Sequence, residues 1–421
     1  IFSHIDHLHQ YFNGGGFCTK ISSSNGIEKC PKLRFQGFTI PWTEIEIGKA
    51  FQVTRGYVLP ATVVRQDASE EYIYPVYSSQ TKDNGLMGYY NDYLYENAIT
   101  WTTDGANAGT VHYRPGKFYC TNVCGVLLSD EGNANRCVAE ILGSVSKKYV
   151  SYVGNPKLMN NVMSEIKIYV PTIDEQKKID DFISVIDHRI EKQLELIEHL
   201  KKYKRGVSKR FFDEIHNDQT CEAKQFSEVF ELIQNNTFSR ECLTDENTDV
   251  LNVHYGDILV KYGSVLDPDI DTVPFIKSGT DLSKFGGSSY LQDGDVIFAD
   301  TAEDYTVGKM CEIINVSNRK ILSGLHTMPF RPTITFAPMY LGYYLNSAAF
   351  RTQILPMIQG AKVSSISKSE MKKTIIHIPS IERQTEIVSI LNALDKRIKR
   401  TELILAELKE MKKGLLQNLF I

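Results

Sequence analysis

The sequence has no long hydrophobic run, few cysteines and no excess of positive charge. No apolar stretch in its 421 residues approaches the roughly 18 that a membrane-spanning helix needs. The first ten residues lack a cationic segment followed by an apolar one, so we expect no secretory signal. Eight cysteines scattered along the chain indicate reduced thiols rather than a disulfide framework. We therefore expect a cytoplasmic protein with no membrane partner.

The charge balance by itself predicts no polyanionic partner. The chain has 47 lysines and arginines against 51 aspartates and glutamates, a formal net charge of −4. Residues 31–170 are balanced, whereas residues 213–378 carry 14 basic against 22 acidic side chains. Such a chain alone would hold DNA weakly at physiological salt, so a DNA-binding function requires a basic partner.

Signatures of common catalytic sites are also missing. The sequence has no P-loop, no Gly-x-Ser-x-Gly, no His-Glu-x-x-His and no Asn/Asp-Pro-Pro-aromatic turn. Glu165-Ile166-Lys167 fits part of a nuclease pattern for Mg²⁺, but this tripeptide is common. Cys120, Cys124, Cys137 and His112 offer zinc-ligand types, although buried thiols are favoured because strand residues four apart share a face. We expect no catalytic residue and no metal site in this chain.

An internal repeat organises the chain. Val170–Phe212 is echoed without a gap by Ile378–Phe420, at a constant offset of 208 residues. The positions that are identical in both copies, numbered in the first, are Pro171, Ile173, Gln176, Ile179, Asp187, Arg189, Ile190, Leu200, Lys201, Lys204, Gly206 and Phe212. Chance seldom aligns so many positions.

Each copy of the repeat predicts one long helix. A proline precedes it, no proline follows, and Glu, Lys, Leu and Ile dominate. About 38 residues at 1.5 Å each give a rod of roughly 57 Å. Apolar residues three or four apart predict a helix–helix seam formed by Ile179, Ile183, Ile186, Ile190, Leu194, Ile197, Leu200, Ile387, Leu391, Leu394, Ile398, Leu405 and Leu408.

The sequence pattern alone leaves two possibilities for the surface against which each predicted helix packs. An ordinary amphipathic helix lying on a globular core is the more common outcome for one such stripe. Ten turns exceed the diameter of a small domain, however, and the stripe occurs twice. We therefore expect the two helices to pair as an antiparallel coiled coil with pseudo-two-fold symmetry.

The segments between the helices are rich in Tyr, Val, Ile, Thr and turn dipeptides, which is typical of β-rich domains. We predict an α+β fold in which two β-rich domains are each followed by a long helix. The expected parts are a tail (1–30), a first domain (31–171), a central helix (172–212), a second domain (213–378) and a C-terminal helix (379–421). In the tail, Ser3, Ile5, Asp6 and His7 match Ser184, Ile186, Asp187 and His188, which indicates either a remnant of helix sequence or a chance match.

Two segments share an outline of strand, polar loop and glycine, Ile99–Gly109 and Val296–Gly308. Polar side chains in such loops can hydrogen-bond to base edges, glycines allow close backbone approach, and lysines or arginines neutralise phosphates. Each basic residue taken alone is more often an ordinary solvated one. The predicted DNA-binding residues are Arg55, Ser79, Lys82, Trp101, Thr102, Thr103, Asp104, Asn107, Arg114 and Lys117 in the first domain, and Lys261, Lys277, Lys284, Thr301, Asp304, Tyr305, Lys309 and Lys362 in the second.

Short motifs occur along the chain in a distinctive order. They are Pro31–Phe38 leading into Pro41-Trp42, Tyr74–Ser79, a Pro-x-Ile-x-x-Gln helix start at Pro171, Gln359–Ile366, and a second such helix start at Pro379. No single motif is decisive, but in this order they resemble the specificity (S) subunit of Type I restriction-modification systems. The resemblance covers roughly Pro31 to Ile421, and residues 1–30 precede its usual start.

The resemblance implies a non-catalytic subunit with two target-recognition domains. Each domain would read one half of a split double-stranded DNA sequence, and the helices would fix the gap between the halves. Two modification (M) subunits and restriction (R) subunits would be the partners, and S-adenosylmethionine, ATP and Mg²⁺ would belong to them, with no cofactor in this chain. One alternative is an interaction scaffold that assembles partners without touching DNA, which the acidic second domain favours; a stand-alone nuclease is another.

Overall fold

The computed structural model describes residues 31, 33–80, 82–360 and 363–419, which divide into two compact units. The first unit comprises residues up to 194 together with those from 403 onward, and the second comprises residues 195–402. Each unit contains β-sheets and a section of each long helix, so the predicted α+β class is confirmed. The predicted tail, residues 1–30, lies outside the described residues. Among the described helices, none combines the length and apolar character that crossing a bilayer requires.

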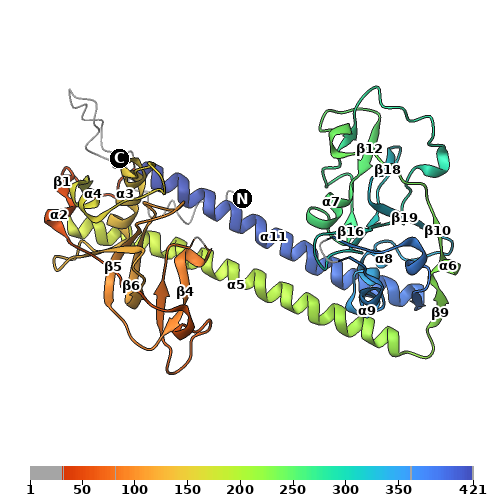
Figure 1. Ribbon diagram of the computed structural model, residues 1–421, viewed down its shortest axis with the longest axis horizontal. Coiled ribbons are helices and arrows are strands. Elements are labelled where there is room, and N and C mark those ends of the chain that lie inside the picture. The colour runs from red at the N-terminus through yellow and green to blue at the C-terminus, as the bar shows by residue number, and fades with distance from the viewer. Residues whose placement is uncertain (1–30, 32, 81, 361–362, 420–421) are drawn as a thin grey trace. The chain divides into compact units, whose positions relative to one another are not determined.

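The first unit is built on a sheet with strand order β2-β7-β5-β6-β3-β4. Figure 1 labels β4, β5 and β6 of this sheet. In this sheet β3 and β6 run parallel, and the other neighbours run antiparallel. A separate antiparallel pair, β1 with β8, joins the beginning and the end of the domain. The strands are β1 (Thr43–Glu46), β2 (Gln52–Arg55), β3 (Tyr74–Tyr77), β4 (Leu86–Tyr90), β5 (Tyr95–Thr102), β6 (Val111–Cys120), β7 (Cys124–Leu128) and β8 (Lys167–Val170).

Helix α3 carries most of the helical packing in this domain. The Asn135 side chain caps it by accepting a hydrogen bond from the backbone N–H of Val138. Its apolar face joins one core cluster with β5, the first turns of α5 (Ile173–Asn217) and Leu419 at the end of α11 (Ile381–Leu419). The helical elements are α2 (Ile47–Ala50), α3 (Arg136–Ser146), α4 (Asn160–Glu165) and the 3-10 turns η1 (Ala61–Val63), η2 (Lys82–Gly85) and η3 (Lys147–Tyr149).

The second unit contains two larger sheets, with strand orders β10-β19-β15-β17-β13 and β11-β14-β12-β18. The pair β9–β21 repeats the β1–β8 arrangement, and β21 lies 208 positions after β8. The strands are β9 (Glu222–Gln225), β10 (Phe230–Leu232), β11 (Leu243–Thr244), β12 (Val250–Val253), β13 (Val265–Leu266), β14 (Phe275–Ile276), β15 (Val296–Ala299), β16 (Thr301–Ala302), β17 (Met310–Ile313), β18 (Lys320–Ser323), β19 (Thr327–Pro332), β20 (Ser364–Ser365) and β21 (Ile375–Ile378).

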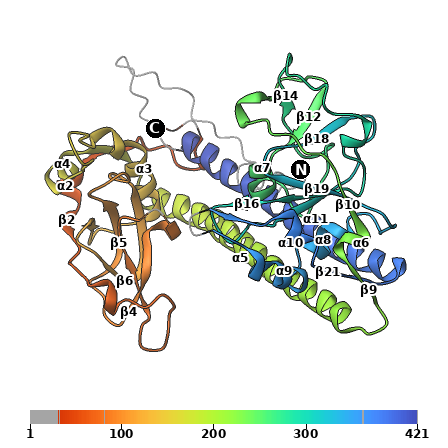
Figure 2. The same cartoon turned by 45° about the vertical axis from the view of Figure 1, so that its right-hand side comes forward.

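Helices α8 and α9 lie beside the long helices in this unit (Figure 2). Tyr340 and Tyr344 of α8 pack on Phe212, with ring centroids 6.2 and 5.6 Å away. The core of this unit therefore joins the domain to both long helices. The helical elements are α6 (Phe226–Val229), α7 (Tyr255–Val260), α8 (Tyr340–Leu345), α9 (Ala348–Ile354), α10 (Lys368–Met371), η4 (Arg240–Cys242), η5 (Gly287–Ser289) and η6 (Leu355–Met357).

The two long helices are α5 (Ile173–Asn217) and α11 (Ile381–Leu419). Helix α5 has 45 residues and extends beyond the predicted end at Phe212. Because Phe212 and Ile215 are both buried in the second core, the apolar stripe continues for a further turn. At 1.5 Å per residue α5 is about 68 Å long, more than the roughly 57 Å expected from the sequence.

The predicted seam residues differ in burial. Ile179, Ile183, Ile186, Ile197, Leu200, Ile387, Leu391, Ile398 and Leu408 are buried, and Ile190, Leu394 and Leu405 are half-buried. Leu194 departs from its predicted role, because it is 44% exposed. The alternating four- and three-residue spacing places Gln193 inward, so Leu194 falls one position beyond the seam.

An ion pair joins α5 to α11 within each unit. In the first, Lys412 Nζ lies 2.9 Å from Asp187 Oδ1. In the second, Lys204 Nζ lies 2.6 Å from Asp395 Oδ1. These four residues are equivalent positions of the repeat. A donor from the adjacent domain completes each pair, Arg136 on Asp187 and the Tyr343 hydroxyl on Asp395.

The Pro-x-Ile-x-x-Gln motif has a structural explanation. The Nε2 atoms of Gln176 and Gln384 donate to the carbonyls of Pro171 and Pro379, in both cases at 2.9 Å. Their Oε1 atoms accept hydrogen bonds from the preceding domains, at 2.7 and 2.8 Å. Both glutamines are at most 1% exposed. Each one therefore fixes the start of a long helix to its domain.

Candidate nucleic-acid interface

The two polar loops predicted from the sequence follow equivalent strands. In the first unit the backbone N–H of Gly109 donates to the carbonyl of Thr102 at 2.9 Å, closing the loop after β5. In the second, Gly308 donates to Ala299 after β15, also at 2.9 Å. Both glycines have positive φ, +81° and +76°, which a side chain would disfavour. The shared outline thus corresponds to a shared backbone arrangement.

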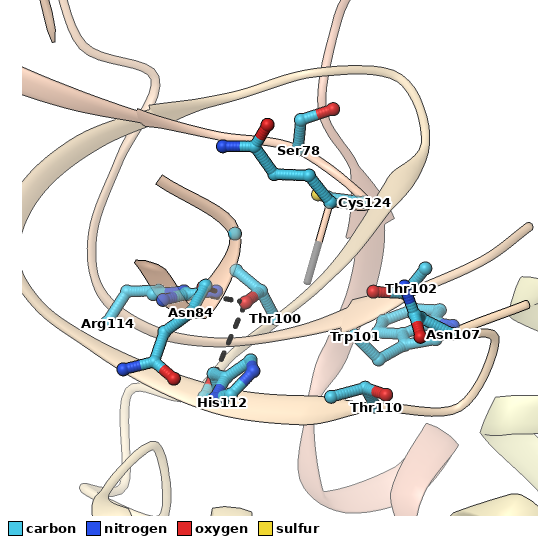
Figure 3. Close-up of a pocket in the computed structure, with 12 residues that line it drawn as sticks. Ser78, Asn84, Thr100, Trp101, Thr102, Asn107, Thr110, His112, Arg114 and Cys124 are labelled. Carbon is cyan, nitrogen blue, oxygen red and sulfur yellow. Dashed lines mark hydrogen bonds between the residues drawn. The ribbon is translucent and has the colours of Figure 1, made fainter. Parts of the chain in front are cut away.

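Several of the predicted residues of the first domain meet around one cavity of about 190 Å³. Trp101, Thr102, Asn107 and Arg114 line it (Figure 3). Figure 3 shows Arg114 grouped with Asn84, Thr100 and His112 on one side, and Trp101, Thr102, Asn107 and Thr110 on the other. Asn107 also donates to the carbonyl of Ser79 at 3.3 Å, which connects the β5 loop to the end of β3.

Trp101 is a core residue in this structure. It is 1% exposed, and its indole Nε1 donates to the carbonyl of Leu158 at 3.0 Å. A Cβ atom at Gly125 would lie 2.1 Å from the indole, so the ring packs directly on the neighbouring strand. The indole hydrogen bond expected for a base edge is therefore already used inside the domain. Thr102 and Thr103 are also buried, at 7% and 4% exposure.

The described lining of this cavity does not include Arg55, Ser79, Thr103, Asp104 or Lys117. Asp104 accepts a hydrogen bond from the Thr103 hydroxyl at 2.7 Å. Arg55 is exposed at the end of β2, and exposed Lys117 lies over the ring of Tyr93, 4.4 Å from its centroid. Lys82 belongs to η2, and its side chain lies outside the described residues.

Arg114 is held rigidly at the wall of the cavity. Its Nε donates to Thr100 Oγ1 at 3.1 Å, and its Nη2 donates to the carbonyl of Asn84 at 2.8 Å. The guanidinium stacks on Tyr77, with 3.7 Å between its carbon and the ring centroid. Arg114 is 6% exposed, and burial lowers its pKa, although an arginine stays protonated.

His112 borders the same cavity and is held neutral. Burial is the main cause that lowers the pKa of His112 to about 4, and the positive charges of Arg114 and Lys412 act in the same direction. The folded protein therefore resists protonating a group that the unfolded chain protonates near pH 6.5. The stability that this neutral histidine contributes is complete above pH 6.5 and is lost as the pH falls towards 4.

Replacing His112 with glutamine should make the free energy of unfolding fall less between pH 7 and pH 5. At pH 5 the histidine should cost the wild-type protein about 2 kcal/mol relative to pH 7, and the variant lacks this loss. The measurement is the free energy of unfolding in urea for both proteins at pH 7 and pH 5. A difference between the two proteins that stays constant over this range would contradict the assignment.

In the second domain the predicted residues are spread over several elements. Lys261, Lys277 and Lys284 are exposed, and Lys261 forms an ion pair with Asp257 at 3.1 Å. Lys309 Nζ donates to the carbonyls of Leu259 and Tyr262 at 2.9 and 3.0 Å, and burial lowers its pKa. Its ammonium is therefore engaged inside the domain rather than free for a phosphate.

The loop of the second domain presents an aromatic side chain to solvent. Tyr305 is 85% exposed, and its backbone carbonyl accepts a hydrogen bond from Arg351 at 2.8 Å. Asp304 caps the turn by accepting from Thr306, whereas the hydroxyl of Thr301 donates to Asp300 at 2.8 Å. Lys362 lies outside the described residues.

Of the twelve described residues that line the cavity, four are predicted from the sequence to bind DNA. Thr100, Thr110 and His112 were not predicted to bind DNA, although they line the cavity with Arg114. β5 and β6 pair Thr100 with His112, and Ala98 with Arg114. Alternate residues of a strand share a face, so polar residues at every second position of two paired strands were the available signal.

The cysteine and histidine set considered for zinc is dispersed. Cys120 and Cys124 pack in one apolar cluster, whereas Cys137 packs in another. Burial raises the pKa of all three thiols, that of Cys124 to about 11. Within the described residues, no group of three or more His, Cys, Asp or Glu side chains is arranged to hold a metal ion.

Comparison with known proteins gives consistent matches. Residues 39–201 and 219–410 match the family described as Type I restriction modification DNA specificity domain. One relative, a type I specificity subunit of Mycoplasma pneumoniae, is 34% identical over 154 residues, which are 36% of this chain and 49% of that protein. The chain thus spans about half the length of this relative. A second M. pneumoniae type I specificity subunit is 26% identical over 340 residues, 77% of this chain and 84% of that protein.

A solved structure has a similar fold. The S subunit of a Type I restriction-modification system from M. genitalium matches with a TM-score of 0.59 at 16% identity. The match covers 93% of this chain and 99% of that chain. At this low sequence identity, the similarity shows only that the two chains share a fold.

Proposed function

Because the chain belongs to the family of Type I restriction modification DNA specificity domains, we propose that it is the DNA-reading subunit of a Type I restriction-modification complex. Each β-rich domain reads one half of a split double-stranded target. The family match over both domains is the observation that carries this proposal. The catalytic chemistry then belongs to two modification subunits, which use S-adenosylmethionine, and to restriction subunits, which use ATP and Mg²⁺.

The proposal includes a spacer made of α5 and α11, paired as an antiparallel coiled coil. The alternating four- and three-residue spacing of buried positions in both helices supports this pairing. So do the ion pairs, because residue numbers rise along α5 from Asp187 to Lys204 while their partners fall along α11 from Lys412 to Asp395. Their placement at equivalent repeat positions supports a pseudo-two-fold relation between the two halves.

This relation gives a physical reason for a split target. Two domains related by a two-fold axis address the two strands of one duplex in equivalent ways. Because the loops after β5 and β15 differ in sequence, the two half-sites differ as well. A helical spacer holds the readers apart, and the bases between them are not read.

The charge distribution favours a partner that contributes to DNA affinity. The second domain has eight more acidic than basic side chains, and Lys261 and Lys309 are engaged within the protein. The net negative charge of this domain opposes contact with phosphates, so we expect its counterion-release contribution to affinity to be small. Basic surfaces of the modification subunits supply the remainder in this proposal.

Mapping of methylated adenines tests the function. DNA from cells expressing this chain with its modification subunits should carry methyl groups in one two-part motif with a fixed gap. Exchanging residues 31–170 for the corresponding domain of another family member should change only one half of the motif. Exchanging residues 213–378 is the matched control and should change only the other half. An unchanged motif in both exchanges, or the absence of any motif with active partners, would contradict the proposal.

A further inference from the structure

The cavity of the first domain contains a buried positive charge, for which the described part of the chain provides no carboxylate partner. Arg114 is 6% exposed, and its hydrogen bonds go to a threonine hydroxyl and a backbone carbonyl, both neutral. Among the described residues it forms no ion pair with a carboxylate. The described residues that line the cavity include no aspartate or glutamate. Burying an unpaired charge is costly, so this arrangement requires an explanation.

Three other buried charges among the described residues are compensated by ion pairs. Arg34, the other buried arginine among the described residues, pairs with Glu175 through two hydrogen bonds of 2.7 Å. Buried Asp257 and Asp295 pair with Arg240 and Arg331. Buried Glu312 also has no cationic partner among the described residues, and its carboxylate accepts hydrogen bonds from the backbone N–H groups of Met339 and Gly342. Of the two buried arginines among the described residues, Arg114 is the one without a carboxylate partner, and it lies at a cavity.

The surroundings of Arg114 are organised around its guanidinium. Asp83 and Asn84 of η2 adopt left-handed backbone conformations, with φ of 50° and 54°, and Gly85 follows with φ of 88°. A Cβ atom at Gly85 would lie 2.8 Å from the carbonyl oxygen of Ser78 and 3.4 Å from Arg114 Nη2. This strained turn brings the Asn84 carbonyl onto the guanidinium, and Tyr77 covers its face. The guanidinium of Arg114 and its N–H donors are thus held in one orientation before any ligand binds.

We propose that this cavity binds a phosphate group, held by Arg114 and by the neutral hydrogen-bonding side chains around it. This inference rests on the proposed function for its biological ligand, a phosphate of the DNA backbone. The volume of about 190 Å³ corresponds to about six water molecules, which leaves room for a tetrahedral oxyanion. The hydroxyls of Thr102 and Thr110 and the amide of Asn107 offer donors opposite the guanidinium.

Inorganic phosphate is the first probe, and it needs no DNA. Titrating phosphate into the full chain at constant ionic strength should raise the melting temperature in a saturable manner, by about 3 °C near saturation. Arg114→Gln should remove this shift. The matched control is Arg65→Gln, which removes an exposed arginine that also lies over a tyrosine, Tyr72, at 5.3 Å. A shift that persists in Arg114→Gln, or is absent from the wild type, overturns the proposal.

A second variant keeps the proposal testable if Arg114→Gln does not fold. Thr110→Leu fills the cavity from the wall opposite Arg114 and leaves the contacts of Arg114 with Thr100, Asn84 and Tyr77 in place. It should abolish the phosphate-dependent shift while circular dichroism and the phosphate-free melting temperature stay close to wild type. If folded Thr110→Leu responds to phosphate as the wild type does, the phosphate does not enter the cavity.

DNA binding then distinguishes the source of the phosphate. In the complex of the full chain with its modification subunits, Arg114→Gln should remove one contact with a DNA backbone phosphate. The affinity for cognate and unrelated duplexes should then fall alike, by about five-fold at 0.15 M salt. The slope of log affinity against log salt should become shallower by about 0.9. A loss confined to the cognate sequence would mean that Arg114 reads a base, and would overturn the proposal. A phosphate response with unchanged DNA affinity identifies free phosphate as the ligand.

Failure of the inference and failure of the proposed function remain distinguishable. If the wild-type complex binds DNA without sequence preference, the proposed function fails. The titration with inorganic phosphate still shows whether the cavity binds phosphate. If the wild-type complex binds its target and Arg114→Gln behaves identically in both assays, only the cavity assignment fails.

Discussion

Replacing Glu175 with alanine should lower the free energy of unfolding of the first unit by about 3–5 kcal/mol, the largest effect of a single substitution that we expect. The Glu175 carboxylate accepts two hydrogen bonds of 2.7 Å from Arg34, and the two side chains are 1% and 2% exposed. Removing the carboxylate takes away the negative charge that Glu175 places against the buried Arg34 guanidinium. The cost is the desolvation of that cation, which the apolar surroundings do not offset.

Urea unfolding followed by circular dichroism measures this effect. Glu46→Ala is the matched control, because Glu46 pairs with Lys49 at 2.9 Å on the surface, where the lysine is 77% exposed. A surface pair of this kind contributes at most about 1 kcal/mol. Glu175→Ala should therefore shift the urea midpoint much further than Glu46→Ala. Equal shifts would contradict the role given to the buried pair.

This pair also explains two motifs that the sequence presents far apart. Arg34 belongs to the Pro31–Phe38 motif, and Glu175 lies in the first turn of α5, next to Gln176. The sequence indicates that both segments matter, but it contains no information that they meet. Contact between residues 141 positions apart is a property of the folded chain, and a single sequence does not encode it as a local pattern.

The long helices were predictable because their signal is local and repeated. A 3.5-residue apolar period over many turns specifies helix and inward face together. The end of α5 was less predictable, since Phe212 and Ile215 continue the helix by packing on Tyr340 and Tyr344, whose position depends on the second domain. Leu194 was assigned to the seam by its type, whereas regular spacing places Gln193 there.

The sequence predicts the strand, loop and glycine outline of the two polar loops, but it does not predict the direction of the side chains in them. Trp101 carries a polar N–H that suggests recognition, yet the residue alternates with Thr100 and Thr102 on β5 and faces the core. The same alternation places Thr100, His112 and Arg114 on the face with the cavity. Strand pairing decides which face is buried, and the pairing of β5 with β6 and β7 follows from the whole sheet.

Lengthening both helices by four residues should change the gap of the methylated motif and leave both half-sites intact. The insertions belong after Leu194 in α5 and after Glu402 in α11, where the first unit gives way to the second. Placed there, they leave the Asp187–Lys412 and Lys204–Asp395 pairs undisturbed. Four residues of helix add about 6 Å, which corresponds to about two base pairs at about 3.4 Å each.

Rotation modifies this estimate and sharpens the test. Four residues turn a helix by about 400°, or about 40° beyond one full turn, whereas each base pair turns DNA by about 35°. Translation therefore favours a gap longer by two base pairs and rotation favours one, so we expect an increase of one or two.

Substituting four residues at the same places without lengthening is the control and should leave the gap unchanged. Inserting four residues into α5 alone shifts its seam against α11 and should abolish methylation of the motif. An unchanged gap in the doubly lengthened protein would contradict the role of the helices as the spacer.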